Sequence, residues 1–243
     1  MNDRGYYDLH LHVLPGVDDG ARTVEAGVEM LRGLHDLGYR HFVATPHCDD
    51  QRWPNDQATL VEAHRRLLEA IDGCGLEVEV LLGAEYTYGP RFHAHVTEKR
   101  AMTLASSRYL LVELPEAFMP ATMPQTLFDV GGHGYYPVLA HPERCKPFHD
   151  DVSRLADLAN GRALVQVSFR SLAGTFGRTI KKTAWRLVTD EIADLVATDC
   201  HDPRELRKVV RPVLLALQSR LDPDHLDRLM HRFPARMIHP PTA

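Results

Sequence analysis

The chain has 243 residues, of which 44% are hydrophobic and 25% charged, a composition typical of a globular protein with an ordinary core. The net charge of −5 argues against a nucleic-acid-binding surface, which requires clustered Lys and Arg. No run approaches the roughly 20 apolar residues of a membrane span, and no secretory signal is visible, so we expect a cytoplasmic protein without membrane insertion. The four cysteines form no C-x-x-C pair, and we expect free thiols at Cys48, Cys74, Cys145 and Cys200.

Short apolar runs alternate with segments of helical periodicity along the whole chain. The runs predict seven strands, at residues 6–13, 41–47, 77–82, 109–115, 136–144, 163–168 and 193–199. The periodic segments predict helices at residues 23–37, 56–71, 90–100, 123–131, 152–160, 179–189, 203–221 and 223–233. Because continuously apolar strands that alternate with helices are typical of a parallel sheet covered by helices, we expect one α/β domain over residues 1–243.

The first predicted strand carries two histidines two residues apart. Since side chains alternate along a strand, His10 and His12 share one face, and Leu9 and Leu11 take the other. Two aspartates follow within a few residues, after a turn. Two imidazoles and a carboxylate at the end of a strand form part of a metal-ligand set, although the same pattern also occurs in a surface strand.

Six of the seven predicted strands end in, or are followed closely by, residues that can bind a metal. In a parallel barrel the carboxyl ends of all strands lie on one face, whereas the outer strands of an open sheet do not reach a common centre. The pattern therefore favours a closed (β/α) barrel. In chain order, the candidate ligands are His10, His12, Asp18 or Asp19, His47, Glu85, Glu113, His141, Asp199 and His201.

Several carboxylates buried at one barrel mouth would repel one another unless cations neutralise them. The number of candidate ligands exceeds the needs of one ion, so we expect two or three divalent ions, with Glu85 as a bridging ligand. A mixed set of imidazoles and carboxylates without thiolate suits manganese, iron or zinc rather than calcium. Cys48 and Cys200 adjoin candidate ligands but point away by alternation, and we interpret them as small hydrophobic residues.

The motifs in this order resemble those of the polymerase and histidinol phosphatase (PHP) superfamily. They are His10-Leu11-His12, Thr45-Pro46-His47, Gly83-Ala84-Glu85, Leu111-Val112-Glu113-Leu114-Pro115, Ala140-His141-Pro142-Glu143-Arg144 and Thr198-Asp199-Cys200-His201. Within this superfamily the chain is similar to the capsule-type manganese-dependent protein-tyrosine phosphatases of bacteria. Two segments carry that similarity, Leu14-Pro15-Gly16-Val17-Asp18-Asp19-Gly20 and Leu172-Ala173-Gly174-Thr175-Phe176-Gly177-Arg178.

The resemblance implies a distorted seven-stranded, TIM-like (β/α) barrel with a trinuclear metal site at its C-terminal face. By matching positions, the candidate ligands above would bind the metals, with one of Asp18 and Asp19 among them and a slight preference for Asp19. Arg144 matches a phosphate-binding arginine. The family has a second such arginine shortly after the Asp-x-His motif, where this chain offers both Arg204 and Arg207.

The expected activity is hydrolysis of phosphotyrosine in a protein, by attack of a metal-bridging hydroxide on phosphorus. The resemblance suggests as substrate the tail of a bacterial tyrosine autokinase of capsule or exopolysaccharide synthesis. A small-molecule phosphatase acting on histidinol phosphate is the alternative enzyme, and a catalytically silent metal-binding regulatory module is the alternative of another class. The candidate residues of the substrate pocket are Tyr86, Tyr88, Phe118 and Phe169.

A cysteine-dependent tyrosine phosphatase is excluded by spacing. Such an enzyme needs a cysteine and an arginine separated by five residues. The positions that would hold this arginine carry Pro54 after Cys48, Asp151 after Cys145 and Leu206 after Cys200.

Overall fold

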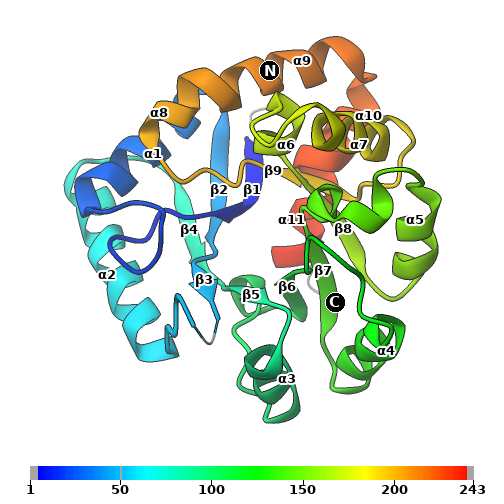
Figure 1. Ribbon diagram of the computed structural model, residues 1–243. Coiled ribbons are helices and arrows are strands. Elements are labelled where there is room, and N and C mark those ends of the chain that lie inside the picture. The colour runs from blue at the N-terminus through cyan, green and yellow to red at the C-terminus, as the bar shows by residue number, and fades with distance from the viewer. Residues whose placement is uncertain (1–4, 50, 240–243) are drawn as a thin grey trace.

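All strands run parallel to their neighbours in the computed structural model, which describes residues 5–49 and 51–239 (Figure 1). A three-stranded sheet has the order β1 (Tyr6–Leu11), β2 (Tyr39–Ala44), β4 (Glu79–Leu82). A six-stranded sheet has the order β3 (His47–Cys48), β5 (Glu85–Thr87), β6 (Tyr109–Glu113), β7 (Tyr136–Ala140), β8 (Leu164–Ser168), β9 (Leu195–Ala197). The predicted parallel α/β class is therefore confirmed.

The second predicted strand, 41–47, is divided between β2 and β3, whereas the third, 77–82, corresponds to β4 and is followed by a separate short strand, β5. Thr45 and Pro46 separate β2 from β3, and a Gly83-Ala84 step separates β4 from β5. Pro46 interrupts the ladder because proline has no backbone N–H. The two sheets still meet at these breaks, where the Gly83 amide donates to the Ala44 carbonyl at 2.9 Å and the Glu85 amide donates to the Pro46 carbonyl at 3.0 Å.

A single closed barrel of seven strands is not confirmed, since hydrogen bonding divides the described strands into sheets of three and six. The first and last strands approach each other without forming a ladder. One bridge joins Leu11 to Cys200, and the amides of His12 and Asp199 donate to the carbonyls of Cys200 and His10 at 3.0 and 2.9 Å. These contacts bring the end of β1 beside the residues that follow β9.

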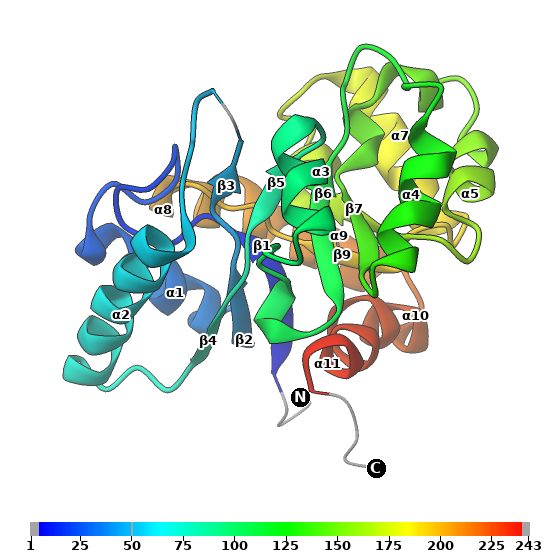
Figure 2. The same ribbon diagram turned by 90° about the horizontal axis from the view of Figure 1, so that it is seen from below.

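Helices surround the strands (Figures 1 and 2). They are α1 (Val24–Asp36), α2 (Gln57–Gly73), α3 (Pro90–Thr97), α4 (Met123–Gly132), α5 (Ser153–Ala159), α6 (Phe169–Ala173), α7 (Arg178–Thr189), α8 (Pro203–Glu205), α9 (Arg211–Arg220), α10 (Pro223–Asp227) and α11 (Phe233–Ile238). Thr23 is the N-cap of α1, because its side chain accepts from the Ala26 amide. Sequence periodicity did not predict α6, nor the π-helical turns Leu206–Val210 and Arg228–Arg232 that divide the last two helices. None of the helices in the described ranges is long and apolar enough to cross a membrane.

Two hydrophobic layers hold the strands in place. The outer layer packs strand side chains such as Leu11 against the helices. The inner layer joins Leu9, Val138 and other strand residues to Met237 and Ile238 of α11. The expectation that Leu9 and Leu11 share a face is wrong, because the register of β1 against β2 is irregular between Asp8 and Leu11.

The inner layer also shows where α11 lies. Its partly buried members include Tyr109 and Tyr136, the first residues of β6 and β7, and α11 contacts β1. Figure 2 shows α11 near the beginning of β1. The helix therefore covers the N-terminal ends of the strands and leaves their carboxyl ends open.

Candidate metal centre

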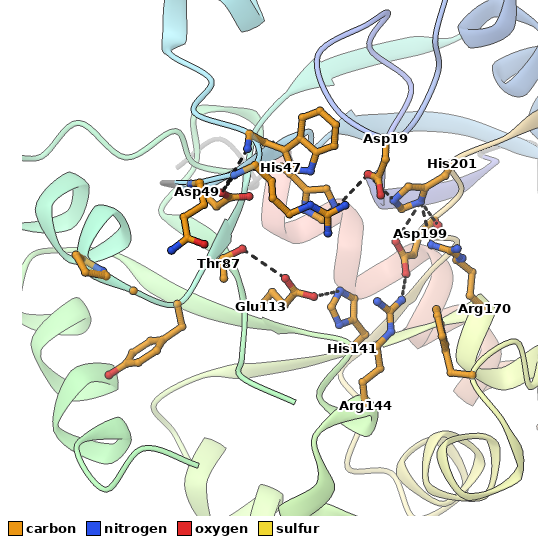
Figure 3. Close-up of a pocket in the computed structure, with 17 residues that line it drawn as sticks. Asp19, His47, Asp49, Thr87, Glu113, His141, Arg144, Arg170, Asp199 and His201 are labelled. Carbon is orange, nitrogen blue, oxygen red and sulfur yellow. Dashed lines mark hydrogen bonds and ion pairs between the residues drawn. The ribbon is translucent and has the colours of Figure 1, made fainter. Parts of the chain in front are cut away.

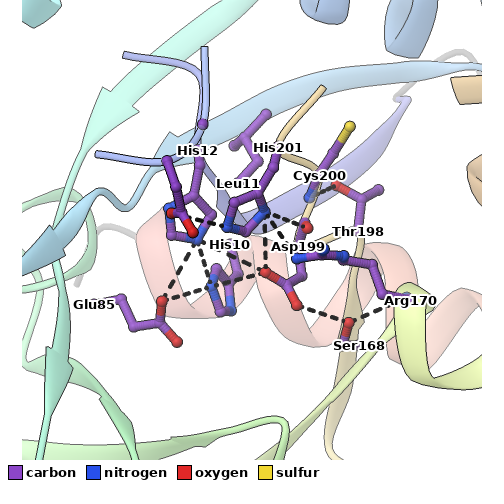
Figure 4. A network of polar contacts seen from close by, with 12 residues as sticks. His10, Leu11, His12, Glu85, Ser168, Arg170, Thr198, Asp199, Cys200 and His201 are labelled. Atoms are coloured by element: carbon purple, nitrogen blue, oxygen red, sulfur yellow. Dashed lines mark hydrogen bonds and ion pairs between the residues drawn. The ribbon is translucent and has the colours of Figure 1, made fainter. Parts of the chain in front are cut away.

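The carboxyl ends of the strands surround a cavity of about 600 Å³ (Figure 3). Its polar lining includes most of the predicted site residues, namely Asp19, His47, Glu113, His141, Arg144, Asp199 and His201. His10, His12 and Glu85 lie fully buried beside them (Figure 4). The structure thus brings residues from both sheets and from the turn after β1 to one centre.

The buried floor of the centre consists of His10, His12 and Glu85. The Nε2 atoms of the two histidines are 3.2 Å apart, and Oε2 of Glu85 lies 3.3 and 3.5 Å from them. This oxygen is buried and makes no hydrogen bond of acceptable geometry within the described part of the chain. An ionised buried oxygen without a hydrogen bond is costly, and a cation among these three atoms would satisfy it. The donor set therefore fits a divalent metal ion.

Two side chains behind the floor orient its imidazoles. Oε1 of Gln166, on β8, lies 2.9 Å from Nδ1 of His10. Oδ2 of Asp18 lies 2.7 Å from Nδ1 of His12. An acceptor at Nδ1 keeps the proton there and leaves the Nε2 lone pair directed at the centre, the arrangement that metal-binding histidines need.

Asp18 and Asp19 have different surroundings. The buried Asp18 carboxylate also accepts from the amides of His47 at 3.0 Å and Gly20 at 2.9 Å, so it is engaged on both oxygens. Asp19 is half-exposed, and its Oδ1 lies 3.5 Å from Nε2 of both His47 and His201. Gly20 permits this turn, because a Cβ there would collide with the His12 carbonyl. The geometry makes Asp19 the residue that faces the cavity.

Glu85 contacts histidines from several strands with its two oxygens. Oε2 lies 2.9 Å from Nδ1 of His47, and Oε1 lies 2.8 Å from Nε2 of His141. Glu113 stands at the edge, with Oε1 3.9 Å from the same His141 nitrogen. Three groups of potential ligands therefore overlap: His12, Asp19, His47 and His201; His10, His12 and Glu85; His47, Glu85 and Glu113.

His141 and Asp199 adopt left-handed backbone conformations, with φ of 34° and 52°. Such conformations are strained for residues other than glycine and concentrate at functional sites. His141 directly follows β7, and Asp199 lies two residues after the end of β9. The turns at these two residues direct both side chains toward the centre. Oδ1 of Asp199 lies 3.7 Å from Nε2 of both His10 and His12, whereas its Oδ2 accepts from Ser168 Oγ at 3.0 Å and from Arg144.

The carboxylates dominate the charge balance of the centre. Burial lowers the pKa of His10, but Glu85 and Asp199 outweigh it and raise this pKa to about 9. Burial likewise opposes charge on His47, whose pKa Glu85 raises to about 10. Burial and the neighbouring Glu85 raise the pKa of Glu113 to about 7. The centre thus favours bound positive charge, whether protons or metal cations.

Two arginines line the cavity beside the acidic centre. Arg144 reaches Asp199, and its guanidinium carbon lies 4.2 Å from the ring centre of Phe176. Arg170 lies on the same side of the site as Arg144, with Nη1 3.3 Å from Nδ1 of His201 and the guanidinium carbon 5.2 Å from the same Phe176 ring (Figure 3). Both guanidinium groups contribute to the cavity lining.

The prediction for the second arginine is not supported by the geometry. Arg204 is exposed and binds Asp202, two residues away, at 2.6 Å, and the exposed Arg207 also lies outside the cavity lining. Arg170 lines the cavity, and the sequence analysis did not single it out. The available signal was its position two residues after β8, the one predicted strand to which no site residue had been assigned.

The aromatic predictions are partly wrong. Tyr88 lines the cavity, but Tyr86 and Phe169 are buried in the outer core and Phe118 is exposed outside the cavity lining. The other aromatic residues of the lining are Trp53 and Phe176. The four cysteines are free, and Cys48 and Cys200 are buried in the outer core, as predicted.

Known proteins resemble this chain in sequence and in fold. The family model described as "Capsular polysaccharide synthesis, CpsB/CapC" matches residues 6–239. The chain belongs to the CpsB/CapC family. It is 32% identical over 212 residues to the tyrosine-protein phosphatase YwqE of Bacillus subtilis, covering 87% of this chain and 84% of YwqE. It is 30% identical over 194 residues to the putative tyrosine-protein phosphatase CapC of Staphylococcus aureus, covering 80% of this chain and 76% of CapC.

Solved structures of other proteins share the fold. One structure from a study of YwqE from Bacillus subtilis and CpsB from Streptococcus pneumoniae, described there as unique metal-dependent tyrosine phosphatases, superposes with a TM-score of 0.86 at 28% identity. It covers 96% of this chain and 94% of its own. The histidinol phosphate phosphatase of Lactococcus lactis has a TM-score of 0.53 at 11% identity, covering 87% of this chain and 93% of its own, which shows a shared fold alone.

Proposed function

We propose that this chain is a metal-dependent protein-tyrosine phosphatase. The observation that carries the proposal is the buried Oε2 of Glu85 at the edge of a cavity that two arginines line. Imidazole nitrogens of His10, His12 and His47 all lie within 3.5 Å of this oxygen, but none forms a hydrogen bond of acceptable geometry with it. A group of metal-binding side chains next to two arginines suits hydrolysis of a phosphate monoester, because metal ions can activate water and arginines can bind the phosphate oxygens. Membership in a family whose relatives are named tyrosine-protein phosphatases supports the same activity.

The proposed ligands would hold two or three divalent cations, which we propose to be manganese. They are His10, His12, Asp19, His47, Glu85, Glu113, His141, Asp199 and His201. Asp18 is proposed as a positioning residue for His12 rather than as a ligand. The strand ends around this centre support a distorted seven-stranded barrel, in which each divided strand counts once. Divalent ions bound there would lower the pKa of water and so supply hydroxide at neutral pH.

The protein's own side chains would bind and orient the phosphoryl group. Arg144 and Arg170 both place guanidinium groups near the Phe176 ring, and a planar guanidinium matches the oxygens of phosphate. Arg144 forms an ion pair with Asp199, a proposed metal ligand, so the same carboxylate would hold both the metal centre and the guanidinium group in place.

The phenol ring of the substrate would lie against the aromatic part of the cavity wall, at Trp53 and Tyr88. Residues on the rim are partly exposed, including Asp19 and Phe176, so a side chain on a peptide could enter while the peptide stays outside. We propose as substrate the phosphorylated tail of a bacterial tyrosine kinase in capsule or exopolysaccharide synthesis, in the cytoplasm. The family description supports the capsule connection.

A comparison of substrates tests this proposal. Protein stripped of metal with a chelator should be inactive, and added manganese should restore hydrolysis of a phosphotyrosyl peptide with a kcat/KM well above that for histidinol phosphate. The His141→Ala variant serves as the negative control. It lacks one proposed metal ligand and should lose the metal-dependent hydrolysis. Preference for histidinol phosphate would overturn the substrate, and absence of metal-dependent turnover of either compound would overturn the activity.

A further inference from the structure

A second group of metal-binding side chains lies at the other end of the strands. It consists of His41 on β2, Glu79 at the start of β4, and His239, which directly follows α11. One ligand atom from each residue lies within 4.8 Å of the other two. None of these residues belongs to the metal centre at the carboxyl ends of the strands.

Glu79 is the centre of this group. Its Oε2 lies 2.8 Å from Nδ1 of His41 and 2.8 Å from Nε2 of His239. Two imidazole nitrogens thus converge on one carboxylate oxygen from different segments of the chain. A small shift of the carboxylate would open a position between three N and O donors, the ligand types that zinc takes in His₂Glu sites.

Regular structure holds the three side chains in place. His41 and Glu79 are direct partners in the parallel ladder of β2 and β4, so they project from the same face of the sheet. His239 is fixed by the preceding residues of α11, because Met237 and Ile238 are buried in the inner core. Ligands carried by such rigid segments need little rearrangement to bind an ion.

The surroundings of the group also suit a bound cation. The Tyr7 ring stacks on His41 with ring centres 4.2 Å apart and meets the edge of His239 at 6.1 Å, which limits the orientations of both imidazoles. The side chains of His41, Glu79 and His239 are 26%, 37% and 40% exposed, so water can reach the group. Zinc with three protein ligands completes its tetrahedral coordination with water.

We propose that His41, Glu79 and His239 form a zinc site that fastens the C-terminal end of α11 to the three-stranded sheet. None of the three residues lines the cavity at the carboxyl ends of the strands, and they come from three separate segments, β2, β4 and the residue after α11, which an ion bound here would join. α11 covers the N-terminal ends of the strands, and its last turn carries Met237 and Ile238 into the inner core. An ion that joins His239 to β2 and β4 would therefore hold this cover in place.

Zinc binding to the folded chain alone would stabilise it. At a zinc concentration of about a hundred times Kd, linkage predicts a rise in melting temperature of about 5 to 10 °C for a domain of this size. The rise would be lost in His239→Gln and Glu79→Gln, which remove a ligand at a partly exposed position. His35→Gln is the matched control, since His35 also lies near a carboxylate, 3.8 Å from Asp36, but outside the group.

The test measures bound zinc and melting temperature in the full-length protein after dialysis, for the wild type and the three variants. Wild type and His35→Gln should bind one more zinc ion per chain than His239→Gln and Glu79→Gln. The rise in melting temperature on adding zinc should also be larger in the first two proteins, by about 5 to 10 °C. Activity with manganese should be unchanged in all four, which confirms that they fold and separates this site from the catalytic one. Equal zinc content and equal thermal shifts in all four proteins would overturn the proposal.

Discussion

Replacing Asp18 with asparagine distinguishes a residue that positions a ligand from a residue that binds metal. Asp18 is buried and accepts three hydrogen bonds, from Nδ1 of His12 and from the amides of His47 and Gly20. His12 and His47 share Oδ2, whereas Gly20 uses Oδ1. Asparagine has one carbonyl oxygen in place of the two carboxylate oxygens Oδ1 and Oδ2. This oxygen can accept hydrogen bonds at only one of the two places, so the asparagine NH₂ group must face an N–H group at the other.

The magnitude follows from those contacts. Loss of a partner that orients a ligating histidine lowers metal affinity by about 10- to 100-fold, which corresponds to about 1.4 to 2.8 kcal/mol. A buried N–H group left without an acceptor also costs about 1–3 kcal/mol of folding free energy. Asp18→Asn should therefore need about 10 to 100 times more manganese for half-maximal activity, while retaining most of its kcat at saturation.

The assay is a manganese titration of phosphotyrosyl-peptide hydrolysis by wild type, Asp18→Asn and Asp19→Asn. Asp19 faces the cavity, so its replacement should lower kcat even at saturating manganese. A wild-type titration curve for Asp18→Asn would refute the positioning role. Loss of kcat in Asp18→Asn that manganese does not restore would instead identify Asp18 as a ligand.

Three further predictions concern the arginines that line the cavity, the protons on His10 and His47, and the inner hydrophobic layer. Arg170→Lys should lower kcat/KM for the phosphotyrosyl peptide about 10- to 100-fold because a lysine lacks the bidentate fork, whereas Arg204→Lys should stay near the wild type; equal effects in steady-state kinetics would contradict the assignment. Neighbouring carboxylates raise the pKa of His10 to about 9 and that of His47 to about 10, so metal binding must displace protons from both imidazoles. Calorimetry should therefore show proton release and a metal affinity that rises from pH 6 to pH 9. An affinity that does not change over this range would contradict the pKa shifts. Met237→Ala should lower the free energy of unfolding in urea by about 2–5 kcal/mol, and a loss below about 0.5 kcal/mol would show that α11 does not close the inner core.

Much of the candidate site was predictable because two local rules determine it. Alternation along a strand places His10 and His12 together, and parallel strands bring their carboxyl ends to one side of the fold. His47, Glu85 and His141 follow from the same rules, since each stands at the end of an apolar run. The parallel α/β class needed only the alternation of such runs with helical segments.

The remainder depended on contacts between distant segments. Asp18 and Asp19 are neighbours in sequence, and only the packing of the turn against His12 and His47 decides which one faces the cavity. Arg170 enters the site because the short helix α6 begins directly after β8, and sequence periodicity did not indicate that helix. The division into two sheets arises from Pro46 and from the Gly83-Ala84 step, which sequence reasoning treated as strand ends.

Anomalous diffraction from crystals of the active, manganese-loaded protein tests the central claim most directly. We expect two or three anomalous peaks in the cavity at the carboxyl ends of the strands, one of them bound by Nε2 of His10, Nε2 of His12 and Oε2 of Glu85, with Asp18 bound to His12 rather than to metal. Active crystals without a peak within coordination distance of His10, His12 and Glu85 would contradict it.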